Sequence, residues 1–166
     1  MVKHAKLMTL VVALIVGAVA LSAAVASAQA PPPYGPAITL EQAKKAMSAA
    51  EAEAMKNKWN VVIVVLDSGG NVVMLHRMDD AQFGSIDVAK SKGYTAVAFR
   101  RPTKVFQDLI AQGGANLRLL NLQGASMLEG GVPIVVGGKL IGGIGVSGVT
   151  SQQDAQIAQA GADAVK

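Results

Sequence analysis

The sequence predicts an α+β domain whose antiparallel sheet is built from two hairpins and flanked by helices. Segments 61–66 and 72–78 are joined by a turn of Asp, Ser, Gly and Asn, and segments 132–136 and 140–146 are joined by Gly-Gly-Lys. Two strand-like segments separated by such a turn are typical of a β-hairpin. Helical patterns precede, separate and follow the hairpins. This order favours an α+β domain over a doubly wound α/β one.

Residues 1–28 have the pattern of a secretory signal peptide. They contain a short basic start, an apolar stretch at 7–21 and an Ala-Ser-Ala cleavage motif at 26–28. The alternative is a membrane anchor, because residues 7–26 are almost long enough to span a bilayer. The cleavage motif and the lack of a charged flank after it favour removal. We expect a mature chain that begins at Gln29 and is exported, to a periplasm or out of the cell, without a stable membrane anchor.

The composition excludes several classes of protein. The chain has no cysteine, which excludes disulfides, a lipid-modified N-terminal Cys and covalent haem attachment through C-x-x-C-H. Lys3 and Lys6 are two of the 15 basic residues, so 13 remain beside 11 acidic ones after cleavage, and the net charge falls from +4 to +2. No basic stripe with interleaved aromatics remains, so we expect no nucleic-acid partner.

The region before the first hairpin contains a proline-rich lead and a helix. Residues 29–37 begin QAPPPYGP, and we expect positions 29–36 to be extended and poorly ordered. A single domain then follows over 38–166. Thr39 and Gln42 form the pattern of a capping box. Apolar residues recur three and four positions apart, which predicts a helix lying on the sheet: Leu40, Ala43, Met47, Ala50 and Ala54.

The first hairpin contains the residues of greatest chemical interest. Segment 61–66 is apolar and dominated by valine, which is typical of a strand covered on both faces. In the strand 72–78, alternation separates two sets of side chains. One face carries Val72, Met74, His76 and Met78, and the other carries Val73, Leu75 and Arg77.

Two helices are predicted between the hairpins. Ser85 is the expected N-cap of the first, which ends at Arg100 or Arg101 because Pro102 follows. Its small residues, among them Ala89 and Gly93, permit close approach to a sheet or to another chain. The second helix is expected to run from position 102 or 103 to 112, before Gly-Gly. Residues 116–128 show no clear pattern.

The second hairpin leads into a last helix. Pro133 is compatible with an edge strand. Either Thr150 with Gln153 or Ser151 with Asp154 is expected to cap the helix.

A glycine pattern in the same segment is a misleading signal. Gly143, Gly145 and Gly148 match the G-x-G-x-x-G of dinucleotide-binding folds. That fingerprint requires a further strand after the helix and, about 20 positions beyond the motif, an acidic residue, whereas the given sequence stops at Lys166. We therefore expect hairpin geometry and a helix cap. A small anion at residues 147–150 is the alternative, although capping satisfies the same N–H groups.

From about residue 38 onward the chain contains a series of short motifs: VLDSGG at 65–70, RMD at 77–79, GSID at 84–87, the stretch 90–103 with FRRPT at 99–103, EGGVPI at 129–134, GVSG at 145–148 and QD at 153–154. In these motifs and their order the chain resembles the family named for haem degradation. This family includes extracellular haem-binding sensor proteins, the glycolate-oxidase-associated protein and the C-terminal domain of propanediol-utilisation adenosyltransferases. The resemblance implies a profilin- or PAS-like sheet with flanking helices, self-association into a homo-oligomer, and haem as a ligand.

Haem requires an axial donor, an apolar slot and cations for two propionates. His76, the only histidine outside the leader, is the candidate metal ligand, and Met74 and Met78 flank it on the same strand face. The alternative is that both methionines pack in the core and His76 is a partly exposed strand residue. Tyr94 is the second candidate for the axial ligand, and it would bind the iron through its oxygen. The candidate cations are Arg77, Arg100, Arg101 and Lys104.

Other candidate sites have structural alternatives. Arg100 and Arg101 could hold a small carboxylate or complement a helix dipole. Glu129 could orient a ligand or simply precede a glycine turn. Asp79 and Asp80 are expected to lie in solvent rather than around a metal ion. The chain lacks G-x-S-x-G and cysteine, so we expect no hydrolase of the Ser-His-Asp or Cys-His type and assign no catalytic residue.

The function expected from these observations is that of an exported protein that binds haem or a related tetrapyrrole for sensing, storage or scavenging. Two alternatives remain open. One is a cofactor-free enzyme or accessory subunit that acts on a small hydroxy- or keto-acid, and the other is an oligomeric scaffold without a small ligand.

Overall fold

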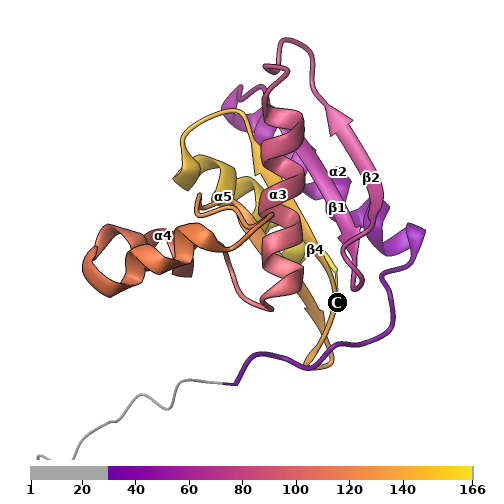
Figure 1. The fold of residues 1–166 in the computed structure, drawn as a ribbon. Helices are drawn as coiled ribbons and strands as arrows, with labels where there is room; N and C mark the ends of the chain where they lie inside the picture. The colour runs from indigo at the N-terminus through magenta and orange to yellow at the C-terminus, as the bar shows by residue number, and fades with distance from the viewer. Residues whose placement is uncertain (1–29, 166) are drawn as a thin grey trace, which may run out of the picture. The chain divides into compact units, whose positions relative to one another are not determined.

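A computed structural model describes residues 30–165, and the predicted signal peptide lies outside these residues. The fold contains a four-stranded antiparallel sheet with helices on both faces (Figure 1), as the sequence predicts. The order of strands across the sheet is β2-β1-β4-β3. Their bounds are β1 (Val62–Asp67), β2 (Val72–Arg77), β3 (Gly131–Val136) and β4 (Lys139–Ser147).

Each hairpin supplies one central and one edge strand. β1 and β4 pair with each other in the middle of the sheet, with Val64 opposite Gly145, so β2 and β3 lie at the edges. Pro133 therefore lies on an edge strand, where its missing N–H costs no ladder hydrogen bond between central strands.

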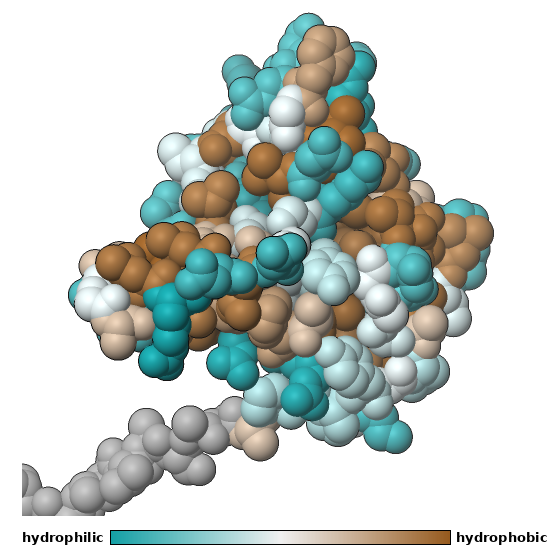
Figure 2. All heavy atoms as spheres, viewed as in Figure 1, coloured by the Kyte–Doolittle hydropathy of each residue, from teal (hydrophilic) through white to brown (hydrophobic). Residues whose placement is uncertain are grey.

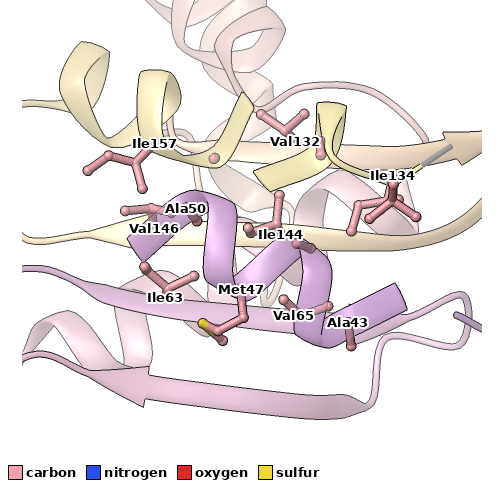
Figure 3. Packing of buried hydrophobic residues seen from close by; sticks show 14 of the residues in the cluster. Ala43, Met47, Ala50, Ile63, Val65, Val132, Ile134, Ile144, Val146 and Ile157 are labelled. Atoms are coloured by element: carbon pink, nitrogen blue, oxygen red, sulfur yellow. The ribbon is translucent and has the colours of Figure 1, made fainter. Parts of the chain in front are cut away.

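The larger core cluster lies between one face of the sheet and two helices, α2 (Leu40–Asn57) and α5 (Ser151–Asp163). Both helices begin with a capping box, Thr39 with Gln42 and Thr150 with Gln153. Of the two predicted caps for the last helix, Thr150 is therefore the one used. Figure 3 shows the side chains that fill this layer, among them Met47, Ala50, Ile63, Val65, Ile144, Val146 and Ile157.

On the other face, α3 (Ser85–Ala98) packs directly against β4 and β1. A Cβ placed on Gly145 would lie 2.0 Å from the carbonyl oxygen of Ala89, and one placed on Gly93 would lie 2.3 Å from a methyl carbon of Leu66. The glycines of the G-x-G pattern thus allow a helix backbone to approach the sheet. Gly84, not Ser85, is the N-cap of α3, and the helix ends at Ala98, slightly earlier than expected.

The segment after α3 projects away from the sheet (Figure 1). It contains α4 (Lys104–Ala111) and η1 (Gly114–Asn121), a 3₁₀ helix in the region that shows no clear sequence pattern. We refer to residues 104–122 as the arm. Phe106 is the one buried residue within these two helices.

The expectation of poor order in the proline-rich lead is wrong for residues 33–36. The amide of Leu140 donates to the Pro33 carbonyl at 2.9 Å, and the Gly35 amide donates to the Leu140 carbonyl at 2.7 Å. Tyr34 pairs in parallel with Leu140. β1 ends opposite Gly142, so the lead occupies the side of β4 that β1 leaves open. Within residues 30–165 no helix is long and apolar enough to cross a membrane.

Candidate functional site

His76 lies on the edge strand β2 and faces helix α2. Its Nδ1 is 2.5 Å from a carboxylate oxygen of Glu51, a residue of α2 that sequence reasoning missed. The His76 side chain is 44% exposed and that of Glu51 is 33% exposed. An ionised carboxylate can only accept hydrogen bonds, so Nδ1 carries the proton that is shared with Glu51. In the neutral imidazole, the lone pair then resides on Nε2.

Met74 and Met78 lie on the same strand face as His76 and pack against the α2–α5 core cluster while remaining partly buried. Figure 3 shows Met47 of α2 in the same layer. Helix residues four apart rise about 6 Å and strand residues two apart about 6.6 Å. Because these repeats match, one stripe of α2 can contact one face of β2. The two methionines therefore have the packing role given above as the alternative to haem contact.

Arg77 points to the opposite face of the sheet. Its guanidinium donates to the Ala81 carbonyl at 3.2 Å and lies 4.9 Å from the centre of the Phe83 ring. Both partners belong to the loop that leads into α3. Arg77 and His76 are therefore neighbours in sequence that contact different faces of the molecule.

The other three predicted cations come after the C-terminal end of α3: Arg100, Arg101 and Lys104. The 14 residues of α3 separate them by roughly 20 Å from the loop before α3 that Arg77 contacts. Arg100 lies 5.3 Å from the centre of the Tyr34 ring and donates to the Pro32 carbonyl at 3.4 Å. Arg100 thus contacts the lead, whereas Arg101 bonds the nearby Phe99 carbonyl.

Lys104 pairs with Asp108 one turn along α4, at 2.9 Å, and both side chains are exposed. The structure therefore divides the predicted haem residues into three groups. His76, Met74 and Met78 lie on the α2 side, Arg77 lies at the start of α3, and the remaining cations lie beyond its end. The exposure of the His76 imidazole is compatible with iron ligation. The predicted cations for the haem propionates, however, do not lie beside His76 in the same chain.

A groove of about 520 Å³ lies elsewhere, between the lead, the start of α2 and the β3–β4 hairpin. It contains none of the predicted site residues. Its lining consists of Pro36, Ala37, Thr39, Gln42, Val136, Gly137, Lys139 and Ile141.

Among the described residues, the most enclosed charged side chains are those of Lys92 and Asp154, which no sequence pattern brings together. The Lys92 ammonium lies 2.7 Å from a carboxylate oxygen of Asp154, and the side chains are 2% and 3% exposed. The other Asp154 oxygen accepts from the Val149 amide at 3.2 Å. Burial raises the pKa of the Asp154 carboxyl, and the hydrogen bond from Lys92 opposes that shift. A pair this enclosed cannot meet a ligand, so its role is structural.

The EGG motif at 129–131 provides space for this pair. A Cβ on Gly130 would lie 2.9 Å from the Lys92 ammonium, and one on Gly131 would lie 2.1 Å from the Lys92 carbonyl oxygen. Glu129 is buried and accepts from the Gln107 side chain at 3.2 Å, while its own amide donates to Gln107 at 2.9 Å. Glu129 thus anchors the arm to the sheet.

The remaining candidate residues do not form a second site. Tyr94 is partly exposed beside the turn glycine Gly70. Thr150 and Gln153 engage the first turn of α5, which supports the capping interpretation of that segment. Over residues 30–165, no group of three or more His, Cys, Asp or Glu side chains could hold a metal ion.

Comparison with known proteins gives consistent matches. The family model described as haem degrading protein HbpS-like matches residues 38–163. A 15.0 kDa protein from the dhaT-dhaS intergenic region of Citrobacter freundii, described as uncharacterized, is 41% identical over 128 residues, 76% of this chain and 90% of the relative.

Two solved structures share the fold over most of the chain. The crystal structure of HbpS has a TM-score of 0.72 at 34% identity and covers 80% of this chain and 92% of that one. The crystal structure of a PduOC haem complex has a TM-score of 0.72 at 32% identity and covers 78% of this chain and 96% of that one.

Proposed function

We propose that this chain, which belongs to the HbpS-like haem-degrading protein family, binds haem or a related tetrapyrrole with His76 as the iron ligand. The similarity to a PduOC haem complex supports haem as the class of ligand. Haem supplies an iron centre with open axial positions, and an imidazole nitrogen is one of the groups that fills such a position in proteins.

The observation that carries this proposal is the state of the His76 side chain. It is 44% exposed, and its Nδ1 is engaged by Glu51, so that Nε2 is the nitrogen available to a ligand. No second histidine competes with it, because the other one in the sequence, His4, belongs to the predicted leader. Met74 and Met78 lie on the same strand face as His76 and pack against the core, so we do not assign them as iron ligands.

The position of the cations favours a haem shared between chains. Arg77 faces away from His76, and Arg100, Arg101 and Lys104 lie beyond the far end of α3. A second chain placed against β2 and α2 would bring its own cations and apolar side chains to the exposed face of the macrocycle. Self-association is thus part of the proposed function.

The arm supports self-association independently. Figure 2 shows apolar side chains gathered over this projecting segment, and Val105, Leu117 and Leu120 are exposed, the last by 61%. A 3₁₀ helix of eight residues is longer than the runs of three or four that are usual. A segment with so few buried side chains has little internal stabilisation, so contact with another copy would add the missing apolar burial.

The predicted signal peptide supports a role outside the cytoplasm, in sensing, storage or scavenging of haem. Titration of hemin into the 29–166 protein tests the proposed ligand. Saturable growth of a Soret band distinct from that of free hemin is expected. Iron-free protoporphyrin in a parallel titration separates recognition of the ring from ligation of the iron. A spectrum that stays equal to that of free hemin would contradict the proposal.

Solution mass tests the second part of the proposal. Light scattering is expected to give a multiple of the chain mass. Replacing Leu117 and Leu120 by Ser is expected to lower that multiple while the circular dichroism spectrum remains unchanged. A monomeric wild-type protein would contradict self-association.

A further inference from the structure

We infer that Glu51 is a positioning residue for the iron ligand: it fixes His76 in the tautomer that presents Nε2 and increases the donor strength of that nitrogen. This inference rests on the proposed function, because it concerns the same imidazole. The two residues lie 25 positions apart in the chain, and each one alone has the properties of an ordinary polar surface residue.

The contact between Glu51 and His76 is specific. Glu51 Oε1 lies 2.5 Å from Nδ1, and His76 is the one hydrogen-bond partner that the described residues offer the Glu51 side chain. Of the other acids of α2, Glu41 pairs with Lys44, three residues along the helix. Glu53 pairs with Lys56 and also accepts a hydrogen bond from Gln156 of α5 at 2.6 Å, so its partners lie on helices. Glu51 is the acid of this helix that reaches across to the sheet.

Glu51 and His76 both lie on regular secondary structure, a helix and a strand. α2 is an 18-residue helix with a capping box at its start and a left-handed C-cap at Lys58. His76 pairs in register with Ile63, which is fully buried in the central strand β1. A ligand and its hydrogen-bond partner held on a helix and a strand are more precisely placed than side chains on loops. Without Glu51, a side chain as exposed as His76 would sample several rotamers.

The hydrogen bond from Nδ1 to Glu51 changes the chemistry of the imidazole as an iron ligand. A carboxylate that accepts the Nδ1 proton of a ligating histidine fixes its tautomer and raises its basicity, and loss of such a partner commonly weakens metal binding about 10- to 100-fold. For haem iron, a stronger axial donor and a nearby negative charge also stabilise the ferric state, which lowers the reduction potential. Glu51 therefore affects both the affinity and the redox behaviour of bound haem.

The first test needs no haem. Nitrogen-15 NMR of the single imidazole in the 29–166 protein reports which ring nitrogen carries the proton. The Nδ1-protonated tautomer is expected in the wild type and in Glu41→Gln, a matched loss of charge on the same helix. Glu51→Ala is expected to shift the imidazole toward the Nε2-protonated form. A wild-type imidazole that is mainly Nε2-protonated would overturn the inference.

The second test uses the hemin complex. Glu51→Gln is expected to weaken hemin binding about 10-fold or more and to raise the reduction potential, whereas Glu41→Gln leaves both unchanged. Glu51→Asp is expected to recover part of the effect. If wild-type protein binds hemin through His76 but Glu51→Gln and Glu51→Ala match it in affinity and potential, the role of Glu51 fails and the proposed function stands. If the wild type does not bind hemin at all, the proposed function fails, and the ligand role of this pair fails with it.

Discussion

Lys92 and Asp154 form an ion pair of 2.7 Å between helices that lie on opposite faces of the sheet. The lysine side chain extends from α3 beside Gly130, and the carboxylate lies in the first turn of α5. The pair therefore joins α3, the turn before β3 and α5 at one end of the sheet. Its environment explains why two glycines follow Glu129.

Removal of one partner of this pair should be more harmful than removal of both. Lys92→Met leaves a buried carboxylate without its cation, and Asp154→Asn leaves a buried ammonium without its anion, so each is expected to cost about 3–5 kcal/mol of unfolding free energy. The double variant should be more stable than the sum of the two losses predicts. Urea unfolding of the four proteins measures the coupling. Strictly additive losses would contradict a direct interaction.

Gly131 should not tolerate a side chain. Its Cβ would lie 2.1 Å from the Lys92 carbonyl oxygen, a backbone atom that cannot move alone. Gly131→Ala is therefore expected to lower the free energy of unfolding by about 1–3 kcal/mol. Gly84→Ala is the control, because a Cβ there meets nothing within 4 Å and its φ is −61°. Equal thermal unfolding midpoints for the two variants would show that the close approach is absent.

The turn between β1 and β2 should weaken in acid. Hydrogen bonds, foremost the one from the Asn71 amide, hold the pKa of the Asp67 carboxyl below its ordinary value of 3.8. The ionised form therefore stabilises the native state above that ordinary value, and this contribution is lost as the pH falls toward the native pKa. Unfolding midpoints between about pH 5 and about pH 2 should decline more steeply in the wild type than in Asp67→Asn. Parallel curves would contradict this assignment.

The lead should detach when the contacts of its Tyr34 with Arg100 and with the end of α3 are removed. The Tyr34 hydroxyl donates to the Val97 and Ala98 carbonyls at 3.1 Å, and Arg100 covers the ring. In Arg100→Ala combined with Tyr34→Phe, the Leu140 amide is expected to exchange with deuterium at least several-fold faster, because it donates to Pro33. Arg101→Ala should leave that exchange unchanged. Unaltered protection in the double variant would show that the lead is held by other contacts.

Local signals predicted the strands and the α-helices of residues 30–165, but not η1. Turn chemistry at 67–71 and 137–139 predicts both hairpins, and capping boxes at Thr39 and Thr150 mark the helix starts that the structure shows. Alternation along β2 also places Met74 and Met78 on a different face from Leu75, as observed. The prediction is wrong for Val73, which packs on the same side as the methionines because the register between β1 and β2 shifts at this point. These features depend on residues within a few positions of one another.

Long-range features could not be predicted in this way. Lys92 and Asp154 are 62 positions apart, and a lysine on a helix is usually a solvated residue. The lead is rich in proline, yet it forms hydrogen bonds with Leu140 of β4. This edge of β4 exists only in the assembled sheet, so it could not be predicted from the lead itself. Residues 116–128 lack a regular apolar period, so the 3₁₀ helix η1 could not be predicted from the sequence. The separation of His76 from the arginines is also a long-range feature. His76 contacts α2 on one face of the sheet, whereas Arg77 contacts the loop before α3 on the other face.

The proposed function depends on ligation of haem iron by His76. Parallel hemin titrations of the wild type and of His76→Ala, both as residues 29–166 and both checked for equal thermal stability, measure this ligation. A saturable Soret band is expected in the wild type, and an affinity about 10-fold weaker or more with a changed band position is expected in the variant. Identical affinity and identical spectra in the two proteins would contradict it.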